Sequence, residues 1–320
     1  MNATQTPGEL PRMAFVGELE FGGGATFLYN LTGALVRRGV PVLVVSPKGG
    51  NAFASDFQAA GVKVVLQDDR LIFEDRLNAV MQTLAKFRPT AVVGCVGGES
   101  YEALRYVPPD IRRIAVIQTD HPPTYDAAIP FAACLDDIVG ISTAIARRLE
   151  TMTEFRTVAK HCLLHGVMIP ATFEPRRQSD RLLRILYLGR LMQEQKRVRL
   201  FPAILEGLKS SGIPFHWTIA GEGPEREFLE RTMNGTPPHQ TVSFPGKIPY
   251  GDIPRILSEH DVFLLASDHE GLPLSLLEAM GHGLVPVVSD LESGVREVVD
   301  ATNGMLVPVD EVEGYARAII

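Results

Sequence analysis

Two glutamates, Glu270 and Glu278, stand eight positions apart, on either side of a glycine–leucine–proline turn. Glycine and proline disfavour a helix interior, so Glu270 is expected on a loop and Glu278 about one turn inside the following helix. The first backbone amides of a helix have no partner within it and favour an anion, while carboxylates suit sugar hydroxyls. The pattern therefore predicts a nucleotide-sugar site, with the sugar at Glu270, a diphosphate between the glutamates and the ribose at Glu278. The residues expected to meet the diphosphate are Gly271, Leu272, Leu274 and Ser275.

Two cations form a second group of chemical interest. A strand-like run, Leu183–Leu188, leads into Gly189 and Arg190, and Lys196 follows after a short loop. A strand that delivers Arg190 to a ligand site, with Lys196 beside it, would neutralise a leaving nucleoside diphosphate. Each charge-assisted hydrogen bond contributes about 1.5–3 kcal/mol. Arg197 is an alternative to Lys196 as the second cation, and an ordinary basic surface loop is the alternative for the whole segment.

The first half of the chain carries two weaker signals. Gly22 and Gly23 belong to a glycine cluster between a strand-like run and a helical pattern, where glycine allows the backbone to approach a phosphate or an acceptor. The cluster lacks the Gly-x-Gly-x-x-Gly spacing of a dinucleotide site. His121 follows the apolar run Ile114–Ile117. A lone histidine is more often structural, but its place after a strand makes His121 a candidate site residue.

The elements that must position these residues alternate along the chain. Apolar strand-like runs separated by helical patterns predict parallel sheets covered on both faces. A stretch rich in proline and polar residues, Met168–Leu182, interrupts the alternation and reads as a linker. We therefore predict an α/β protein of two doubly wound, Rossmann-like domains, 1–170 and 171–320, with ligand in the cleft at the carboxyl ends of the strands. The predicted strands are Met13–Val16, Val42–Ser46, Val64–Leu66, Ala91–Val93, Ile114–Ile117, Ile138–Ile141, Leu183–Leu188, Thr218–Ala220, Val262–Leu265, Val285–Val288 and Met305–Val307.

Composition excludes several classes of protein. The 320 residues carry a net charge of −7, with 16 basic against 17 acidic residues in 1–170 and 15 against 21 in 171–320. Neither half is basic, so a nucleic-acid partner is not expected, although a local basic face could contact anionic lipid. The three cysteines lack metal-ligand spacing and fit a reducing compartment.

The ends of the chain add two expectations. The N-terminus is polar, without a signal peptide, and no apolar run approaches the ~20 residues of a membrane span. We therefore expect a cytosolic protein, with peripheral contact at the inner face of a membrane left open. The last residues, Ala316–Ile320, lie in a helical pattern that begins at Glu311 without a stop signal, which predicts that the C-terminal helix is truncated.

The glutamate segment resembles the signature of retaining GT-B glycosyltransferases of family four, E-G-x-P-x-x-x-x-E-A-M-A-x-G-x-P-V-V. This chain reads Glu270-Gly271-Leu272-Pro273, then Glu278-Ala279-Met280-Gly281-His282-Gly283-Leu284-Val285-Pro286, with Gly281 in place of an alanine. The Gly189-Arg190 element resembles the family's Gly-Arg–loop–Lys segment, whose common spacing is one residue shorter. His165-Gly166-Val167 resembles an Asn-Gly-Val element without the asparagine. Pro245–Ile248 resembles the turn that meets the nucleobase, near Ile248.

The resemblance implies a GT-B fold and transfer of a glycosyl unit, expected to be a hexosyl, from a nucleoside diphosphate sugar to an acceptor hydroxyl with retention. It implies that Glu270 contacts the sugar and Glu278 the ribose. Arg190 and Lys196 would stabilise the leaving group, and His121 would face the sugar from the first domain. The departing phosphate would help to deprotonate the acceptor, so no protein nucleophile is needed.

Donor and acceptor identities stay open in the sequence. UDP is the favoured nucleotide, and glycan, lipid-linked and small-molecule acceptors are all compatible. No cofactor and no metal are expected, because the chain has no Asp-x-Asp and no His/Cys/carboxylate cluster with metal spacing. A non-catalytic nucleotide-sugar-binding module and a GT-B sugar-nucleotide epimerase are the competing hypotheses.

Overall fold

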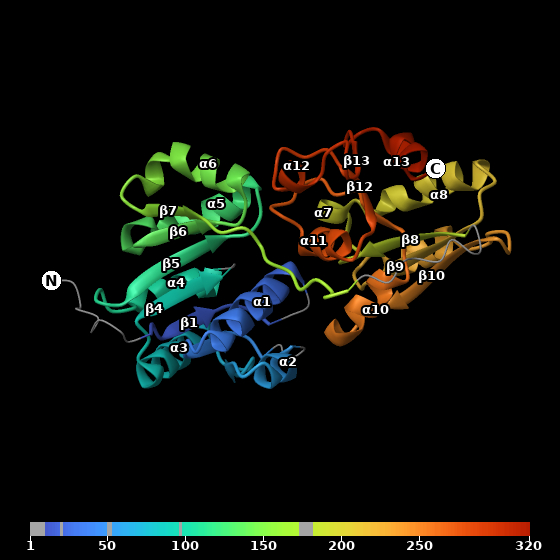
Figure 1. Cartoon of the computed structure of the whole chain (residues 1–320). Helices are drawn as coiled ribbons and strands as arrows, with labels where there is room; N and C mark the ends of the chain where they lie inside the picture. The colour runs from blue at the N-terminus through green and yellow to red at the C-terminus, as the bar shows by residue number, and fades with distance from the viewer. Residues whose placement is uncertain (1–9, 20–21, 50–52, 96–97, 173–181) are drawn as a thin grey trace. The chain divides into compact units, whose positions relative to one another are not determined.

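The computed structural model of the protein describes residues 10–19, 22–49, 53–95, 98–172 and 182–320. The chain folds into two compact units, Met1–Gly166 and Val167–Ile320. Each unit is a parallel sheet with helices packed on it (Figure 1). Most of the predicted linker, residues 173–181, lies outside the described residues.

The described residues of the first unit form a seven-stranded sheet in the order β3-β2-β1-β4-β5-β6-β7. Every neighbouring pair is parallel. Its strands are β1 (Met13–Val16), β2 (Val42–Ser46), β3 (Lys63–Leu66), β4 (Ala91–Cys95), β5 (Arg112–Ile117), β6 (Asp137–Gly140) and β7 (Ala159–Cys162). Its α-helices are α1 (Gly23–Arg37), α2 (Ala54–Ala59), α3 (Phe73–Phe87), α4 (Gly98–Tyr106), α5 (Pro122–Ala128) and α6 (Thr143–Thr151).

The sequence of the central strands explains their place in the sheet. All five residues of β2 and all five of β4 are buried, as expected for parallel strands covered on both faces. The helix α1 ends at Arg37, and Gly39 follows with a φ of 80°, a left-handed conformation that glycine adopts without strain.

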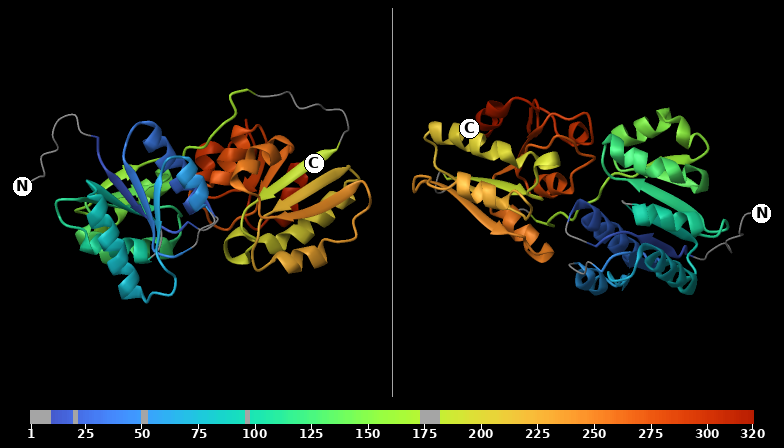
Figure 2. Two further views of the ribbon diagram at one scale, coloured as in Figure 1. Left: turned by 90° about the horizontal axis from the view of Figure 1, so that it is seen from below. Right: turned by 180° about the vertical axis from the view of Figure 1, so that it is seen from behind.

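The second unit has a six-stranded parallel sheet in the order β10-β9-β8-β11-β12-β13. Its strands are β8 (Leu183–Leu188), β9 (Phe215–Ala220), β10 (Gln240–Gly246), β11 (Val262–Leu265), β12 (Val285–Ser289) and β13 (Met305–Val307). Its α-helices are α7 (Gln193–Lys196), α8 (Phe201–Ser210), α9 (Arg226–Thr232), α10 (Ile253–Ser258), α11 (Leu274–Gly281), α12 (Val295–Val298) and α13 (Val312–Ile319). Figure 2 shows helices on both sides of this sheet.

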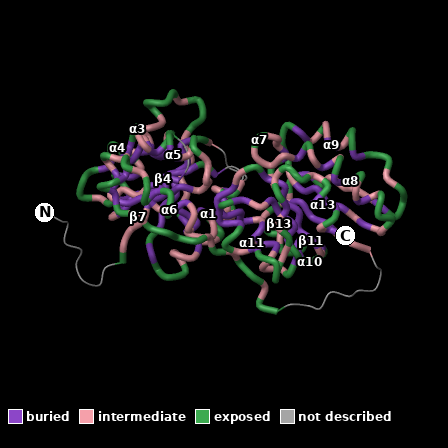
Figure 3. The backbone as a smooth tube through the Cα atoms, turned by 90° about the horizontal axis from the view of Figure 1, so that it is seen from above, coloured by how far each residue is buried: buried purple, intermediate pink, exposed green. Residues whose placement is uncertain are grey.

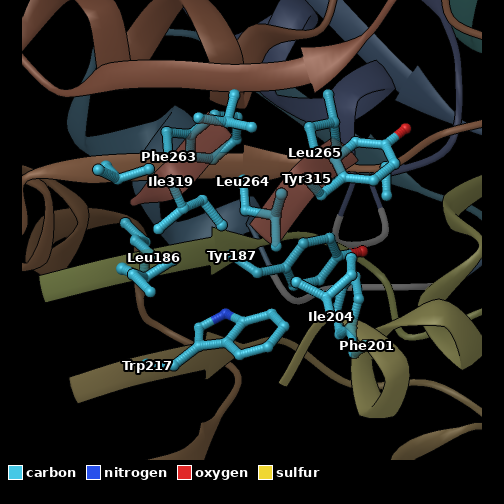
Figure 4. Packing of buried hydrophobic residues seen from close by; sticks show 14 of the residues in the cluster. Leu186, Tyr187, Phe201, Ile204, Trp217, Phe263, Leu264, Leu265, Tyr315 and Ile319 are labelled. Atoms are coloured by element: carbon cyan, nitrogen blue, oxygen red, sulfur yellow. The ribbon is translucent and has the colours of Figure 1, made fainter. Parts of the chain in front are cut away.

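The core of the second unit joins the sheet to α8 and α13. The ring of Phe201 lies 5.0 Å from that of Tyr187 and 5.2 Å from that of Trp217, measured between centroids. Tyr315 and Ile319 of α13 belong to the same buried cluster (Figure 4). Buried residues likewise follow the strands in the backbone tube of Figure 3. Truncation of a fully buried phenylalanine to alanine costs about 3–5 kcal/mol, so this cluster fixes β8 and β9 firmly.

The structure corrects the predicted elements in two ways. The segment Gly221–Pro224, with a proline that suits a first helical turn, would be expected to start a helix, but α9 begins only at Arg226. Gly221 and Gly223 instead pass so close to the chain after β8 that a Cβ would lie 1.8 Å from the Gly189 carbonyl oxygen and 2.3 Å from that of Leu191. In addition, the structure contains two strands that the sequence patterns did not predict, β7 and β10, and several short helices between the predicted strands. The edge strands β7 and β10 are mostly exposed or half-buried, so they lack a strong apolar pattern.

Candidate functional site

The predicted site residues of the second unit gather at the carboxyl edge of its sheet. The chain runs from β8 outward through β9 to β10, then returns to the other side of β8 as β11. Connections from β8 and β11 therefore diverge at this point, where open α/β sheets bind ligands. Arg190 and Lys196 follow β8, and Glu270 follows β11.

A hydrogen bond from a buried tyrosine holds the turn that carries Arg190. The Tyr187 hydroxyl donates a hydrogen bond to the Arg190 carbonyl oxygen at 2.6 Å. Tyr187 is fully buried. Burial raises the pKa of its phenol well above the usual value, and the nearby negative charge of Glu270 raises it further. The tyrosine is therefore a neutral donor under the turn, while the Arg190 side chain is exposed.

Glu270 is a buried carboxylate, with 6% of its surface exposed. Its Oε1 atom accepts a hydrogen bond from the Ser267 hydroxyl at 2.7 Å and pairs with the Lys196 ammonium. The Lys196 side chain is 12% exposed. Charges this far from water persist only when they are paired and hydrogen-bonded, so the two residues form one unit.

Gln195 connects this pair to Arg190. Its Oε1 accepts a hydrogen bond from Arg190 Nη2 at 2.9 Å. Its Nε2 donates to the His269 carbonyl oxygen at 3.3 Å and lies 3.5 Å from Glu270 Oε2. The Gln195 carbonyl oxygen also accepts from the Asp268 amide at 2.8 Å. Neither Gln195 nor Ser267 was predicted, because no spacing rule marks a neutral residue that acts through a neighbour.

Glu278 lies in α11, as predicted, and is 7% exposed. Burial raises the pKa of its carboxyl to about 7. Among the described residues, no side chain donates a hydrogen bond to this carboxyl group. An unpartnered buried carboxyl is costly, which is typical of a group kept for a ligand.

The start of α11 presents the expected amides. The first intrahelical bond runs from the Leu277 amide to the Pro273 carbonyl oxygen, at 3.2 Å. The amides of Leu274 and Ser275 come before it and have no partner within the helix. The preceding loop is fixed by a hydrogen bond of 2.7 Å from the Gly294 amide to the Gly271 carbonyl oxygen.

The structure separates the two alternative cations. Arg197 Nη1 donates to the Val309 carbonyl oxygen at 2.5 Å, and Nη2 lies 3.7 Å from Asp310. Arg197 thereby ties the end of α7 to the connection between β13 and α13. Lys196, not Arg197, contacts Glu270.

The remaining predicted residues occupy turns. Ile248 is half-buried and follows β10, which ends at Gly246. In the first unit, Gly22 and Gly23 form the start of α1, next to the end of β1, and a Cβ added to either glycine would meet open space. His121 immediately precedes α5 and lies four residues after Ile117, the buried end of β5. Contacts of these residues with a donor stay predictions.

Asp120, the neighbour of His121 in the sequence, is held by two side chains of the first unit. The Tyr125 hydroxyl donates to Asp120 Oδ1 at 2.7 Å, and Arg148 Nε lies 3.1 Å from the same atom. The Asp120 side chain is buried, with 6% exposed. The turn that carries His121 is thus held by the contacts of buried Asp120 with Tyr125 and with half-exposed Arg148.

Comparisons with known proteins agree with this arrangement. Residues 183–320, which contain the whole site of the second unit, match the family model described as glycosyl transferases group 1. The chain is 35% identical over 144 residues to the putative colanic acid biosynthesis glycosyltransferase WcaL of Escherichia coli. That alignment covers 43% of this chain and 35% of WcaL, so the chain spans about a third of the relative's length.

Solved structures show the fold over nearly the whole chain. A mutant of TarM from S. aureus, crystallised with fondaparinux, alpha-GlcNAc-glycerol and UDP, gives a TM-score of 0.79 at 12% identity, covering 97% of this chain and 92% of that one. HepE from Anabaena, in complex with UDP-glucose, gives 0.78 at 16% identity, covering 97% and 88%. The chain has the GT-B fold, as predicted. The described helices include none that is long and apolar enough to cross a membrane.

Proposed function

We propose that this protein is a retaining glycosyltransferase that moves a hexosyl unit from a nucleoside diphosphate sugar to an acceptor hydroxyl. The observation that carries the proposal is the buried Lys196–Glu270 pair. The pair lies between the connections that follow the neighbouring strands β8 and β11, where the strand order of the sheet changes direction. The match of residues 183–320 to glycosyl transferases group 1 supports it. UDP is the proposed nucleotide, supported by the UDP-glucose complex of HepE.

The contacts of Glu270 suggest how it serves the reaction. Its Oε1 is taken by Lys196 and Ser267, whereas Oε2 receives only the long contact from Gln195 among the described residues. Oε2 is therefore the atom that would accept a hydrogen bond from a sugar hydroxyl. A carboxylate held by several donors is a weak nucleophile, which favours an orienting role for Glu270.

The leaving diphosphate would be stabilised by two kinds of donor. Arg190 has an exposed guanidinium, and the amides of Leu274 and Ser275 open α11. Donors that are fixed before the reaction stabilise developing charge without reorganisation. Glu278, with its pKa near 7, would hold the ribose hydroxyls. The departing phosphate would then take the proton of the acceptor hydroxyl.

The acceptor is proposed to be a glycan. Support comes from the colanic acid biosynthesis named for WcaL and from the fondaparinux bound to the TarM mutant. An acceptor panel with free oligosaccharides, lipid-linked oligosaccharides and small alcohols would test this, because transfer to only one class identifies it.

A thermal-shift panel of UDP, GDP and ADP sugars, followed by a transfer assay, tests the function. A ligand at 100 times its Kd stabilises a fold by about 2.7 kcal/mol, so the preferred donor should raise Tm clearly. Lys196→Met should abolish transfer. Lys209→Met, which removes a surface ion pair with Glu206, is the matched control and should stay active.

Each other outcome has a distinct meaning. No Tm shift with any donor would contradict a nucleotide-sugar site. Binding without turnover across the panel would favour a non-catalytic module. Conversion of the donor without an acceptor, seen by product analysis, would favour an epimerase.

A further inference from the structure

The side chain of Gln195 reaches both halves of the site in the second unit. Its amide touches the guanidinium of Arg190 on one side and the loop of Glu270 on the other. Its backbone carbonyl holds the Asp268 amide of the same loop. The connection after β8 and the connection after β11 therefore meet at Gln195 as well as at the Lys196–Glu270 pair.

The chemistry of the partners fixes the orientation of the amide. A guanidinium has only donors, so the oxygen of Gln195 must face Arg190. A carbonyl and a carboxylate have only acceptors, so the nitrogen must face His269 and Glu270. Glutamine is thus suited to join the cation to the anion at this place. A glutamate here would face Glu270 with like charge, and a lysine would face Arg190 with like charge.

We propose that Gln195 is a positioning residue, which sets the distance between the guanidinium that binds the leaving diphosphate and the carboxylate that orients the sugar. This rests on the proposed transferase function. Gln195 would act through Arg190 and Glu270, without contacting the reacting atoms. Its loss would allow the two groups to move independently, and small misplacements of bound groups cost large factors in rate.

Two variants test the proposal in different ways. Gln195→Met keeps the length of the side chain but removes its hydrogen bonds, so kcat should fall by at least about tenfold while donor affinity changes little. Gln195→Glu places a second carboxylate about 3.5 Å from Glu270 Oε2. Two carboxylates in one site share a proton, so the acid limb of the kcat/KM profile should move upward by at least about one pH unit.

Gln193→Glu is the matched control. Gln193 lies on the same short helix, and its Oε1 accepts a hydrogen bond from the Arg199 amide at 3.0 Å, which a carboxylate can preserve. Gln193→Glu introduces the same charge but should have the same kcat/KM pH profile as the wild type. If Gln195 were merely structural, its variants would lower Tm without moving the acid limb.

The experiment separates the two proposals. UDP-sugar binding and transfer by the wild type are measured first, and their absence would overturn the proposed function itself. An active wild type together with Gln195 variants that keep both its kcat and its pH profile would overturn the role of Gln195 alone. A shifted acid limb in Gln195→Glu, absent in Gln193→Glu, supports the proposal.

Discussion

The hydroxyl of Tyr187, on the buried strand β8, donates a 2.6 Å hydrogen bond to the carbonyl oxygen of Arg190. A side chain from the aromatic core thereby holds the turn that presents a site cation. Tyr187→Phe keeps the packing and removes this bond. We expect a stability loss of about 1 kcal/mol, because the turn loses one hydrogen bond while the Arg190 carbonyl oxygen keeps the Met192 amide at 3.2 Å.

The same variant should impair the reaction more than the fold. A looser Arg190 turn should lower kcat, while Tm changes by only a few degrees. Steady-state kinetics beside thermal unfolding would check this. Phe201→Leu, which alters the same aromatic cluster without touching the turn, is the control. Equal loss of activity in both variants would contradict a specific role for the hydroxyl.

Glu278 should give the protein a pH-dependent stability. Burial raises the pKa of its carboxyl from the ordinary 4.5 to about 7. Between these values the native state binds more protons than the unfolded state, so stability falls as pH rises. At about 1.4 kcal/mol per pKa unit, the total loss across the window is about 3 kcal/mol.

Glu278→Gln should remove this dependence. Urea unfolding at pH 5 and pH 8 would show a smaller difference in unfolding free energy for the variant than for the wild type. The variant should also bind the donor more weakly, because an amide replaces the acceptor proposed for the ribose. Identical pH dependence in both proteins would contradict the buried, unpartnered state of this carboxyl.

Ser267→Ala tests the support of Glu270. The substitution removes the 2.7 Å hydrogen bond to Oε1 and leaves Lys196 as the partner of that atom. We expect a five- to twentyfold lower kcat/KM, which corresponds to about 1–2 kcal/mol, because the carboxylate loses one hydrogen bond of about 1.5–3 kcal/mol and part of that loss is recovered by the remaining Lys196 contact. Ser258→Ala, on the exposed end of α10, is the control. Unchanged kinetics would show that Lys196 alone positions the carboxylate.

Arg197→Met tests whether Arg197 stabilises the fold, as its contacts indicate, and does not bind the donor. Arg197 binds the Val309 carbonyl oxygen, so its loss should lower Tm by several degrees through the connection to α13. Donor affinity should change less than in Lys196→Met. Titration of both variants with the preferred UDP-sugar would check the order, and a greater loss of affinity in Arg197→Met would reverse the assignment.

Much of the fold follows from local patterns. The central strands, such as Val42–Ser46, were predicted with their observed limits because fully buried parallel strands are continuous apolar runs. The edge strand Ala159–Cys162 has no such run, since it is mostly exposed, and it was missed. Glu270 and Glu278 were placed on the correct loop and helix because glycine and proline determine where α11 can begin.

The partners of these groups could not be predicted in the same way. Lys196 was expected beside the diphosphate, and the structure shows that it contacts Glu270, which lies 74 positions away. Gln195 meets residues of the same distant loop. Such contacts depend on the adjacency of β8 and β11, which is a property of the strand order. Motif spacing carries no information about which neutral side chains fill the space between two distant segments.

The close passage of Gly221 past the Gly189 carbonyl has a consequence for how the site can vary. The Gly189 amide binds the Ala220 carbonyl oxygen at 3.0 Å, and the Gly221 amide binds that of Gly246 at 2.8 Å. Backbone hydrogen bonds therefore connect the turn after β8 to the end of β9, and the turn after β9 to the end of β10. These bonds extend the sheet beyond the ends of its strands. Adaptation to new ligands on this side would require coordinated changes in all three turns.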